Sequence, residues 1–369
     1  MKKPKKSGTG PGVGKMRAQV DAIDGKIIEL LNERARASQK IGKLKREVGE
    51  GVYAPHREKE VLDRLKSTNR GPLTASAIEA IYREIMSSSI RLEKPVRIAY
   101  LGPEYTFTHQ AAQKKFGSSV NYFSCSNISD VFAEVERGRS DYGVVPVENS
   151  TEGAVNYTLD MFIESNLKIC AELYLPIGHH LLSNASSMKS INQVYSNPQA
   201  FAQCRLWLES NLPGAKLVST SSTADAAKYV SDHPKFSNET ACVASLLAAK
   251  AYKLKVLAPS VEDNANNTTR FIVISRTEAR PTNHDRTSIV FAIKDRVGAL
   301  HDMLVPFRRE KINLTKIESR PSKKKAWNYF FFVDFEGHHE EPAIRRALSE
   351  LEGLCTFLKV LGSYPRAEA

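Results

Sequence analysis

Apolar residues in the first quarter of the chain recur with the spacing of a long amphipathic helix. Residues 16–48 contain no proline, and their apolar positions return every three or four residues: Met16, Val20, Ile23, Ile27, Leu30, Leu31, Ile41 and Leu44. This predicts one helix of roughly 45–50 Å. Residues 56–67 and 74–91 predict two further helices, the last with Thr74 as N-cap. A domain of this size cannot cover the apolar face of so long a helix, so we expect the helix to pack on a second copy of the chain. The predicted assembly is a homodimer, with a tetramer left open.

The middle of the chain alternates between short apolar segments and polar loops that lead into helices. Apolar segments at residues 96–101, 141–147, 193–196 and 255–258 are each strand-like, and residues 271–274 form a short β-branched run. Such alternation predicts an α/β unit with ligand-binding loops at the strand ends. We expect two lobes with a cleft between them, with residues 169–177 as a strand crossing from one lobe to the other.

The last segment, residues 285–369, has a different order of elements. Apolar strands and amphipathic helices follow one another as βαββαβ, which is the ferredoxin-like order. The sequence therefore predicts a multidomain chain: an all-α unit at 16–94, a two-lobed α/β unit at 95–276, and an α+β unit at 285–369.

Composition narrows the class of protein. The 369 residues are 41% hydrophobic and 25% charged, values typical of soluble globular proteins, and no apolar run could span a bilayer. Residues 1–15 are rich in Lys, Gly and Pro, so we expect a disordered basic tail and not a secretory signal. The five cysteines are far apart, which predicts reduced thiols in a cytoplasmic protein, with no metal site, no disulfides and no membrane association.

The net charge of +12 favours an anionic ligand. Residues 1–94 hold 21 basic and 12 acidic side chains, so most of the excess lies in the helical unit and its tail. Aromatic residues are not interleaved with these cations, which argues against nucleic acid. A small polyanionic substrate fits better.

Helical spacing groups several charged residues. Arg34 and Lys45 are about three turns apart and share a face, whereas Arg17 lies about 100° from it. Arg17 therefore fits the pocket of a partner chain better than its own. Arg57 and Glu58 open the second helix, and Ser89 and Glu93 share a face of the third. The same spacing would also occur if these residues only formed solvent-exposed helix faces. If the helices face one another, these groups form a pocket suited to a small dicarboxylate.

This pattern resembles the all-helical chorismate mutases. The resemblance implies that Arg17 (from the partner), Arg34, Lys45, Arg57, Glu58, Ser89 and Glu93 bind chorismate, with Arg34, Lys45 and Glu93 as catalytic groups. The pericyclic rearrangement to prephenate needs no cofactor, because conformational restriction and charge stabilisation suffice. Two positions depart from the family: Ala54, where Asp is common, and Glu93, where Gln is common. A carboxyl group donates only when protonated, so we expect mutase activity to fall as Glu93 ionises.

The two-lobed unit resembles prephenate dehydratase. Four motifs occur in that family's order, at residues 102–108, 146–150, 196–199 and 267–271, with Tyr105 replacing a common Gly. The reaction expels CO₂ and hydroxide, so the leaving group needs an acid. The resemblance implies that Thr269 donates or positions this proton, that Arg270 binds a carboxylate or is structural, and that Glu148 orients its neighbours. The remaining cleft residues would be Thr106, Asn149, Ser150, Thr151, Ser196 and Gln203.

The C-terminal unit resembles the ACT regulatory domain. Its two motifs, Gly298-Ala299-Leu300 and Glu318-Ser319-Arg320-Pro321, imply an L-phenylalanine site between protomers, and Gly298 would let backbone approach the amino acid. A dimerisation module that binds nothing is the alternative. The whole chain is thus expected to make phenylpyruvate for phenylalanine synthesis under feedback by phenylalanine. Two other hypotheses stay open: a phenylalanine-sensing binding protein, and a prephenate or arogenate dehydratase with a weak mutase.

Overall fold

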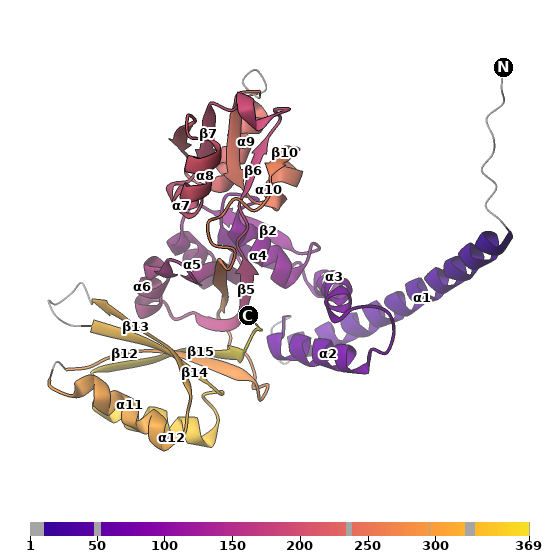
Figure 1. The fold of residues 1–369 in the computed structure, drawn as a ribbon. Helices are drawn as coiled ribbons and strands as arrows, with labels where there is room; N and C mark the ends of the chain where they lie inside the picture. Colours follow the sequence, from indigo (N-terminus) through magenta and orange to yellow (C-terminus); the bar gives the residue numbers. More distant parts are fainter. Residues whose placement is uncertain (1–10, 48–52, 234–237, 295, 322–328, 369) are drawn as a thin grey trace, which may run out of the picture.

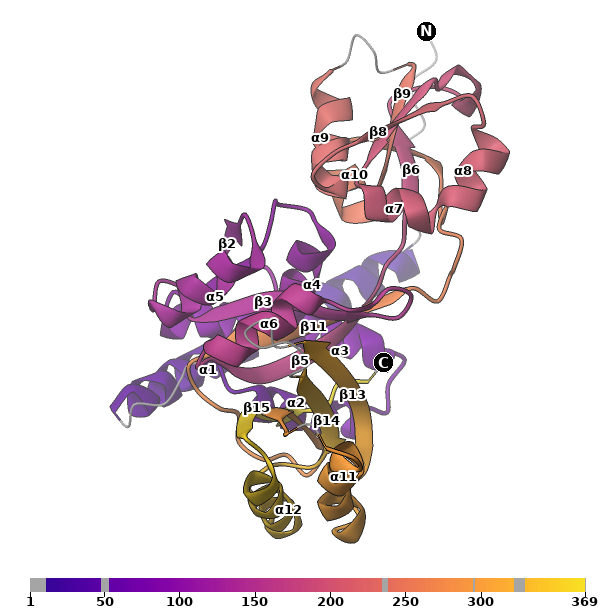
Figure 2. The same ribbon diagram turned by 90° about the vertical axis from the view of Figure 1, so that its left-hand side faces the viewer.

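The chain folds into three units in the order expected from the sequence. The computed structural model describes residues 11–47, 53–233, 238–294, 296–321 and 329–368. Figure 1 shows a helical unit with one projecting rod, a central unit with one lobe above the other, and a sheet covered by two helices. In Figure 2 the upper lobe stands apart from the lower one and is joined to it by two segments of chain. The predicted fold class is confirmed.

The helical unit contains α1 (Pro11–Glu47), α2 (Pro55–Thr68) and α3 (Ala75–Glu93). The predicted cap of the third helix is confirmed, because Oγ1 of Thr74 accepts a hydrogen bond from the backbone N–H of Ala77 at 3.2 Å. Helix α1 starts at Pro11, so residues 11–15 are helical and do not belong to a disordered tail. Residues 1–10 of that expected tail lie outside the described part of the chain.

Among the described residues, no other helix lies beside most of α1 (Figure 1). Its N-terminal half projects from the body of the molecule (Figure 1). The apolar side chains that predicted a buried stripe are exposed, Leu30 by 63% and Met16 by 54%. Single exposed apolar residues are normal, but a whole stripe of them on one rod is typical of an interface.

The lower lobe is built on a sheet in the order β2-β1-β3-β11-β5, with β4 paired to β3. Its strands are β1 (Arg97–Leu101), β2 (Asn121–Cys125), β3 (Tyr142–Asn149), β4 (Gly153–Ala154), β5 (Lys168–Pro176) and β11 (Thr268–Ser275), and its helices are α4 (Phe107–Phe116), α5 (Ile128–Glu136) and α6 (Asn156–Glu164). Strand β11 is antiparallel to β3 and β5 and is buried along most of its length. The predicted apolar run at 271–274 is therefore a central strand.

The upper lobe has a second sheet in the order β10-β6-β9-β7-β8. Its elements are β6 (His180–Ser183), η1 (Met188–Ser190), β7 (Gln193–Ser196), α7 (Pro198–Gln203), α8 (Arg205–Asn211), β8 (Lys216–Ser219), α9 (Thr223–Asp232), β9 (Thr240–Ala244), α10 (Leu246–Ala251) and β10 (Lys255–Ala258). The chain enters this lobe from β5 and returns into β11, so the loops at both crossings border the space between the lobes.

The C-terminal unit is a four-stranded antiparallel sheet in the order β13-β14-β12-β15, with two helices on one face. Its elements are β12 (Asp285–Ala292), α11 (Ala299–Arg309), β13 (Leu314–Pro321), β14 (Tyr329–Glu336), α12 (Pro342–Leu354) and β15 (Phe357–Pro365). Strand β15 packs so closely on β5 that a side chain at Gly362 would overlap the backbone oxygen of Ile169. This unit is thus seated directly on the lower lobe.

No helix in the described ranges is both long and apolar enough to cross a membrane.

Candidate active sites and their contact with the C-terminal unit

A cavity of about 400 Å³ lies between the three N-terminal helices, and we call it the helical cavity. Six of the seven residues predicted for this pocket line it: Arg34, Lys45, Arg57, Glu58, Ser89 and Glu93. Arg34 donates to the hydroxyl of Ser89 at 2.8 Å, which joins α1 to α3. Gly42 faces Glu93, and a Cβ there would lie 2.7 Å from Cγ of Glu93. The glycine therefore gives the Glu93 side chain its room.

Arg17 is exposed on the projecting half of α1 and is not among the residues that line the helical cavity. This matches its angular offset from Arg34. Arg57 lines the cavity, but its side chain is 56% exposed and pairs with Glu60 at 2.8 Å. Ala54 caps α2 without a side-chain hydrogen bond, so this position adds no polar group to the cavity wall.

Glu58 is held by two neighbours that the sequence did not indicate. The hydroxyl of Tyr53 donates to its Oε2 at 2.7 Å, and Nζ of Lys115 lies 3.3 Å from the same oxygen. Burial and the Glu58 carboxylate raise the pKa of Tyr53 well above its ordinary value, so its phenol stays a neutral donor. Tyr53, Lys115, Arg64 and Arg83 also line the helical cavity. The wall carries more cations than carboxylates, which suits a dianion.

In the two-lobed unit, Thr269 and Asn149 face each other on neighbouring strands. They are directly opposed across β11 and β3, and Thr269 is 8% exposed. The Oδ1 atom of Asn149 accepts from the backbone N–H groups of Thr151 and Glu152 at 3.0 and 3.1 Å. A backbone N–H can only donate, so this orients the amide and turns Nδ2 toward Oγ1 of Thr269 at 2.8 Å. The Thr269 oxygen accepts, which leaves its own proton available to a ligand.

The hydrogen bonds of Asn149 continue to the upper lobe. Nδ2 of Asn149 also donates to Oδ1 of Asn267 at 2.7 Å, and Nδ2 of Asn267 donates to Oε1 of Gln203 at 3.0 Å. Nε2 of Gln203 then donates to Glu152 at 2.6 Å. Residues from β3, β11 and α7 thus form one directed network between the lobes.

His179 joins this network. Its Nε2 lies 2.7 Å from Oε1 of Gln203, whose amide group is already turned toward Glu152. The ring nitrogen must therefore carry the proton and donate. Burial lowers the pKa of His179, so the ring is neutral near pH 7. Glu152 and His179 are the residues of this network that sequence reasoning missed.

The other predicted cleft residues have mainly structural contacts. Thr106 caps α4 by accepting from the backbone N–H of His109 at 3.4 Å. Ser150 links its loop to β11, since its hydroxyl accepts from the backbone N–H of Thr268 at 2.9 Å. Ser196 is fully buried and donates to the backbone oxygen of Val243 at 2.7 Å. These groups shape the loops around the network.

Arg270 points away from Thr269 and its network, because neighbouring residues of a strand face opposite sides. It is 5% exposed and donates to Glu172 at 2.8 Å, to Asp334 at 2.6 Å and to the hydroxyl of Tyr364 at 2.9 Å. Asp334 and Tyr364 belong to the C-terminal unit. Of the two roles that the sequence left open for Arg270, these contacts favour the structural one.

Glu148 lies on the same side as Arg270, with its Oε2 3.0 Å from Nζ of Lys316 on β13. Arg286 donates to Glu172 at 2.6 Å, and the hydroxyl of Ser288 donates to Asp334 at 2.5 Å. We call these residues, together with Glu148, Arg270 and Lys316, the interdomain cluster. Burial alone would raise the pKa of Asp334, but Arg270 and the hydroxyl of Ser288 hold it below its ordinary value. Asp334 is therefore ionised at neutral pH, and its ion pair with Arg270 connects β11 to the C-terminal unit.

The two predicted motifs of the C-terminal unit lie in different surroundings. Gly298, Ala299 and Leu300 line a cavity of about 270 Å³ together with Tyr329 and Phe331. Gly298 has φ of 79°, a conformation that favours glycine. The second motif, Glu318 to Pro321, ends β13 and is not among the residues that line this cavity.

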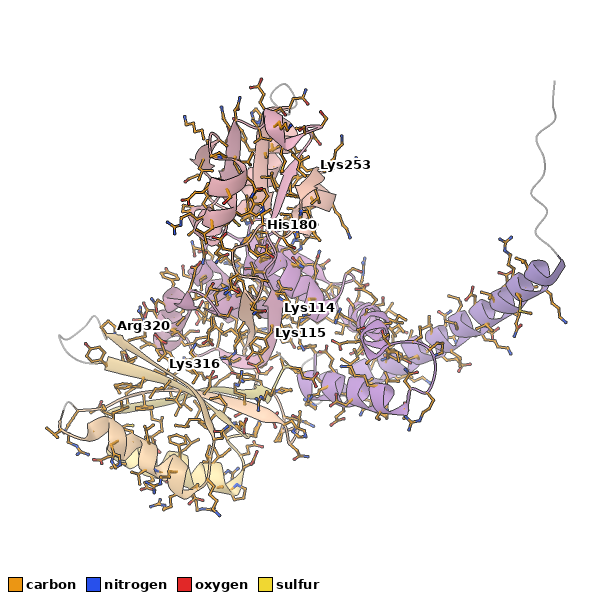
Figure 3. All side chains as sticks on the ribbon, viewed as in Figure 1. Lys114, Lys115, His180, Lys253, Lys316 and Arg320 are labelled. Carbon is orange, nitrogen blue, oxygen red and sulfur yellow. The ribbon has the colours of Figure 1, made fainter. Side chains whose placement is uncertain are left out.

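Arg320 of the second motif contacts the two-lobed unit. It pairs with Asp160 of α6 at 3.1 Å. Figure 3 labels Arg320 and Lys316 along the boundary between the C-terminal sheet and the lower lobe. The motif is therefore part of the contact between the two units.

Three family models match the chain in succession. The model for chorismate mutase type II matches residues 16–94, that for prephenate dehydratase matches residues 98–279, and that for the ACT domain matches residues 287–353. Together with the helical cavity and the hydrogen-bond network around Thr269, these matches define a class: two-activity enzymes of aromatic amino acid synthesis with a regulatory domain.

Whole-chain relatives carry both activities in their names. A bifunctional chorismate mutase/prephenate dehydratase of Aquifex aeolicus (strain VF5) is 49% identical over 356 residues, covering 95% of this chain and 97% of the relative. That of Pseudomonas aeruginosa is 46% identical over 358 residues, with the same coverage. The chain belongs to the family of bifunctional chorismate mutase/prephenate dehydratases.

A solved structure matches the last two units. The prephenate dehydratase of Arthrobacter aurescens in complex with L-Phe is 34% identical, with a TM-score of 0.67, covering 73% of this chain and 90% of that one. We hereafter call the three units the mutase, dehydratase and ACT domains.

Proposed function

We propose that the chain converts chorismate to prephenate in the helical cavity, and prephenate to phenylpyruvate in the cleft. Membership of the bifunctional family supports both steps. The observation that carries the proposal for the cleft is the Thr269 hydroxyl, whose oxygen accepts from Asn149 and whose proton is therefore free for a ligand. The observation that supports the first step is the cation-rich wall of the helical cavity.

In the helical cavity, the cations hold both carboxylates of chorismate and favour its compact, reactive conformer. Arg34 is fixed by Ser89, and Lys45 lies on the same face of α1. Lys45 and Glu93 donate toward the ether oxygen as the carbon–oxygen bond breaks and negative charge grows there. Arg17 serves the cavity of a second protomer, which requires a homodimer built on the exposed stripe of α1.

In the cleft, the Thr269 hydroxyl lies where a proton is needed. The ring carboxylate of prephenate leaves as CO₂, its electrons enter the ring, and the carbon–oxygen bond to the ring hydroxyl breaks. That hydroxide takes a proton and leaves as water, so one proton is consumed in each turnover. Gln203 and Asn267 link the lobes by hydrogen bonds, which excludes water from the reacting groups when the cleft closes.

L-Phenylalanine binds the ACT domain and lowers dehydratase turnover. The cavity formed by Gly298, Ala299 and Leu300 supports this, as does the L-Phe complex of the Arthrobacter relative. Because Glu318 to Pro321 do not line this cavity, we assign the complete site to two protomers, each supplying one motif.

The test supplies chorismate, prephenate and arogenate separately to the purified full chain. Phenylpyruvate from both chorismate and prephenate, reduced by L-phenylalanine, is the expected result. Phenylpyruvate from prephenate alone would leave a dehydratase without a working mutase. Phenylalanine from arogenate in preference to prephenate would reassign the substrate, and L-phenylalanine binding without turnover would leave a sensing protein.

A further inference from the structure

The wall of the helical cavity is completed by a helix of another domain. Lys115 and Phe116 line this cavity, yet both belong to the C-terminal end of α4 in the dehydratase domain. Figure 3 labels Lys115 and its neighbour Lys114 where the dehydratase sheet meets the mutase helices. The mutase site therefore includes residues that lie outside residues 16–94.

Packing holds Lys115 in this position. The ring of Phe116 contacts that of Tyr53, with 4.9 Å between centroids, and Nζ of Lys115 lies 5.8 Å from the Tyr53 centroid. Tyr53 is buried in the same core as Val96 and Phe116, so the two domains share this part of the core. The Lys115 side chain is 19% exposed, too little for a freely moving surface lysine.

The charge of Lys115 meets the carboxylate of Glu58. Its Nζ and the Tyr53 hydroxyl both contact Oε2, at 3.3 and 2.7 Å. Among the described residues, Oε1 has no hydrogen-bond partner, so it can accept from a hydroxyl of a ligand. Without Lys115, Glu58 would lose this ion pair and would repel a substrate with two carboxylates of its own more strongly.

We propose that Lys115 is a positioning residue for the mutase reaction, one that orients and neutralises Glu58 from the dehydratase domain. This rests on the proposed mutase activity. Because the contact with Glu58 exists before and during the rearrangement, Lys115 contributes to substrate and transition-state binding alike. Its loss therefore raises KM more than it lowers kcat.

The test compares Lys115→Ala, Lys115→Arg and Lys114→Ala in the full chain. Lys114 is the matched control, because its Nζ donates to the backbone oxygen of Tyr174 at 2.9 Å and it does not line the helical cavity. We expect Lys115→Ala to raise the KM for chorismate about tenfold with little change in kcat. Lys115→Arg restores the KM, Lys114→Ala leaves it unchanged, and dehydratase turnover of all three variants verifies that they fold.

A double-mutant cycle with Glu58→Gln separates positioning from packing. If Lys115 acts through Glu58, Lys115→Ala has a smaller effect on KM in the Glu58→Gln background than in the wild type. Equal effects in both backgrounds, an unchanged KM in Lys115→Ala, or the same increase in Lys114→Ala would each overturn the proposal. A wild-type chain that turns over prephenate but not chorismate would overturn the proposed mutase function, and this inference with it.

Discussion

Replacing Thr269 by valine tests the proton-donor assignment with little change of shape. Valine keeps the branched side chain and removes the hydroxyl that lies 2.8 Å from Nδ2 of Asn149. A positioned general acid contributes about 10²–10⁴-fold to a rate, so the dehydratase kcat should fall by that factor. In transition-state free energy this is about 2.7–5.5 kcal/mol.

The valine variant should remain folded. Nδ2 of Asn149 keeps its bond to Asn267, so one hydrogen bond is lost at a cost of about 0.5–1.5 kcal/mol. That is small against a typical stability of about 5–15 kcal/mol. The helical cavity does not include Thr269, so mutase turnover should be unchanged.

Both activities can be followed on one preparation, by the loss of chorismate absorbance and by the absorbance of phenylpyruvate in alkali. Thr268→Val is the matched control, because Thr268 lines a separate cavity on the ACT side of the sheet, together with Arg270 and Asp334. Thr269→Ser keeps a hydroxyl and should retain much of the turnover. A Thr269→Val enzyme that converts prephenate near the wild-type rate would refute the assignment.

Three further predictions concern other parts of the chain. Glu93→Gln should remove the alkaline decline of mutase activity, because an amide donates at every pH; an unchanged pH–rate profile would contradict the role of Glu93. Gly298→Trp should abolish inhibition by L-phenylalanine without loss of dehydratase turnover, and undiminished inhibition would count against the site. Asp334 has a pKa below its ordinary value in the folded chain, so it stabilises the fold above its unfolded pKa of about 3.9 and this contribution disappears as pH falls further. Asp334→Asn should therefore flatten the acid limb of the melting temperature measured against pH, and parallel curves would disprove the coupling to Arg270.

Periodicity was enough to predict the helical unit and the order of elements in the C-terminal unit. The apolar spacing in residues 16–44 predicted α1, and Thr74 predicted the start of α3, because both signals are local. The predicted start of α1 at Met16 was wrong, since the helix begins at Pro11. Proline and glycine at 11–14 are poor helix formers and argued against a helix there, but proline is tolerated in the first turn. The order of strands and helices after residue 285 predicted the ACT topology for the same reason.

The two sites were only partly predictable. Neighbouring side chains of a strand point to opposite faces of the sheet, so Thr269 and Arg270 cannot lie on the same face. The sequence alone could therefore have placed Arg270 on the face opposite Thr269. The contact of Arg270 with Asp334 joins residues 64 positions apart and has no local signature. Lys115 and His179 were missed because their partners, Glu58 and Gln203, lie on other elements, and spacing along one element cannot bring them together.

Helix α4 makes the two catalytic domains hard to separate. Thr106 caps it beside the dehydratase loop, and ten residues later, about 15 Å away, Phe116 packs on Tyr53. A fragment ending at Lys94 would uncover the ring of Tyr53 and open one side of the cavity. A separate mutase protein derived from this enzyme would therefore need other residues to cover Tyr53 in place of α4.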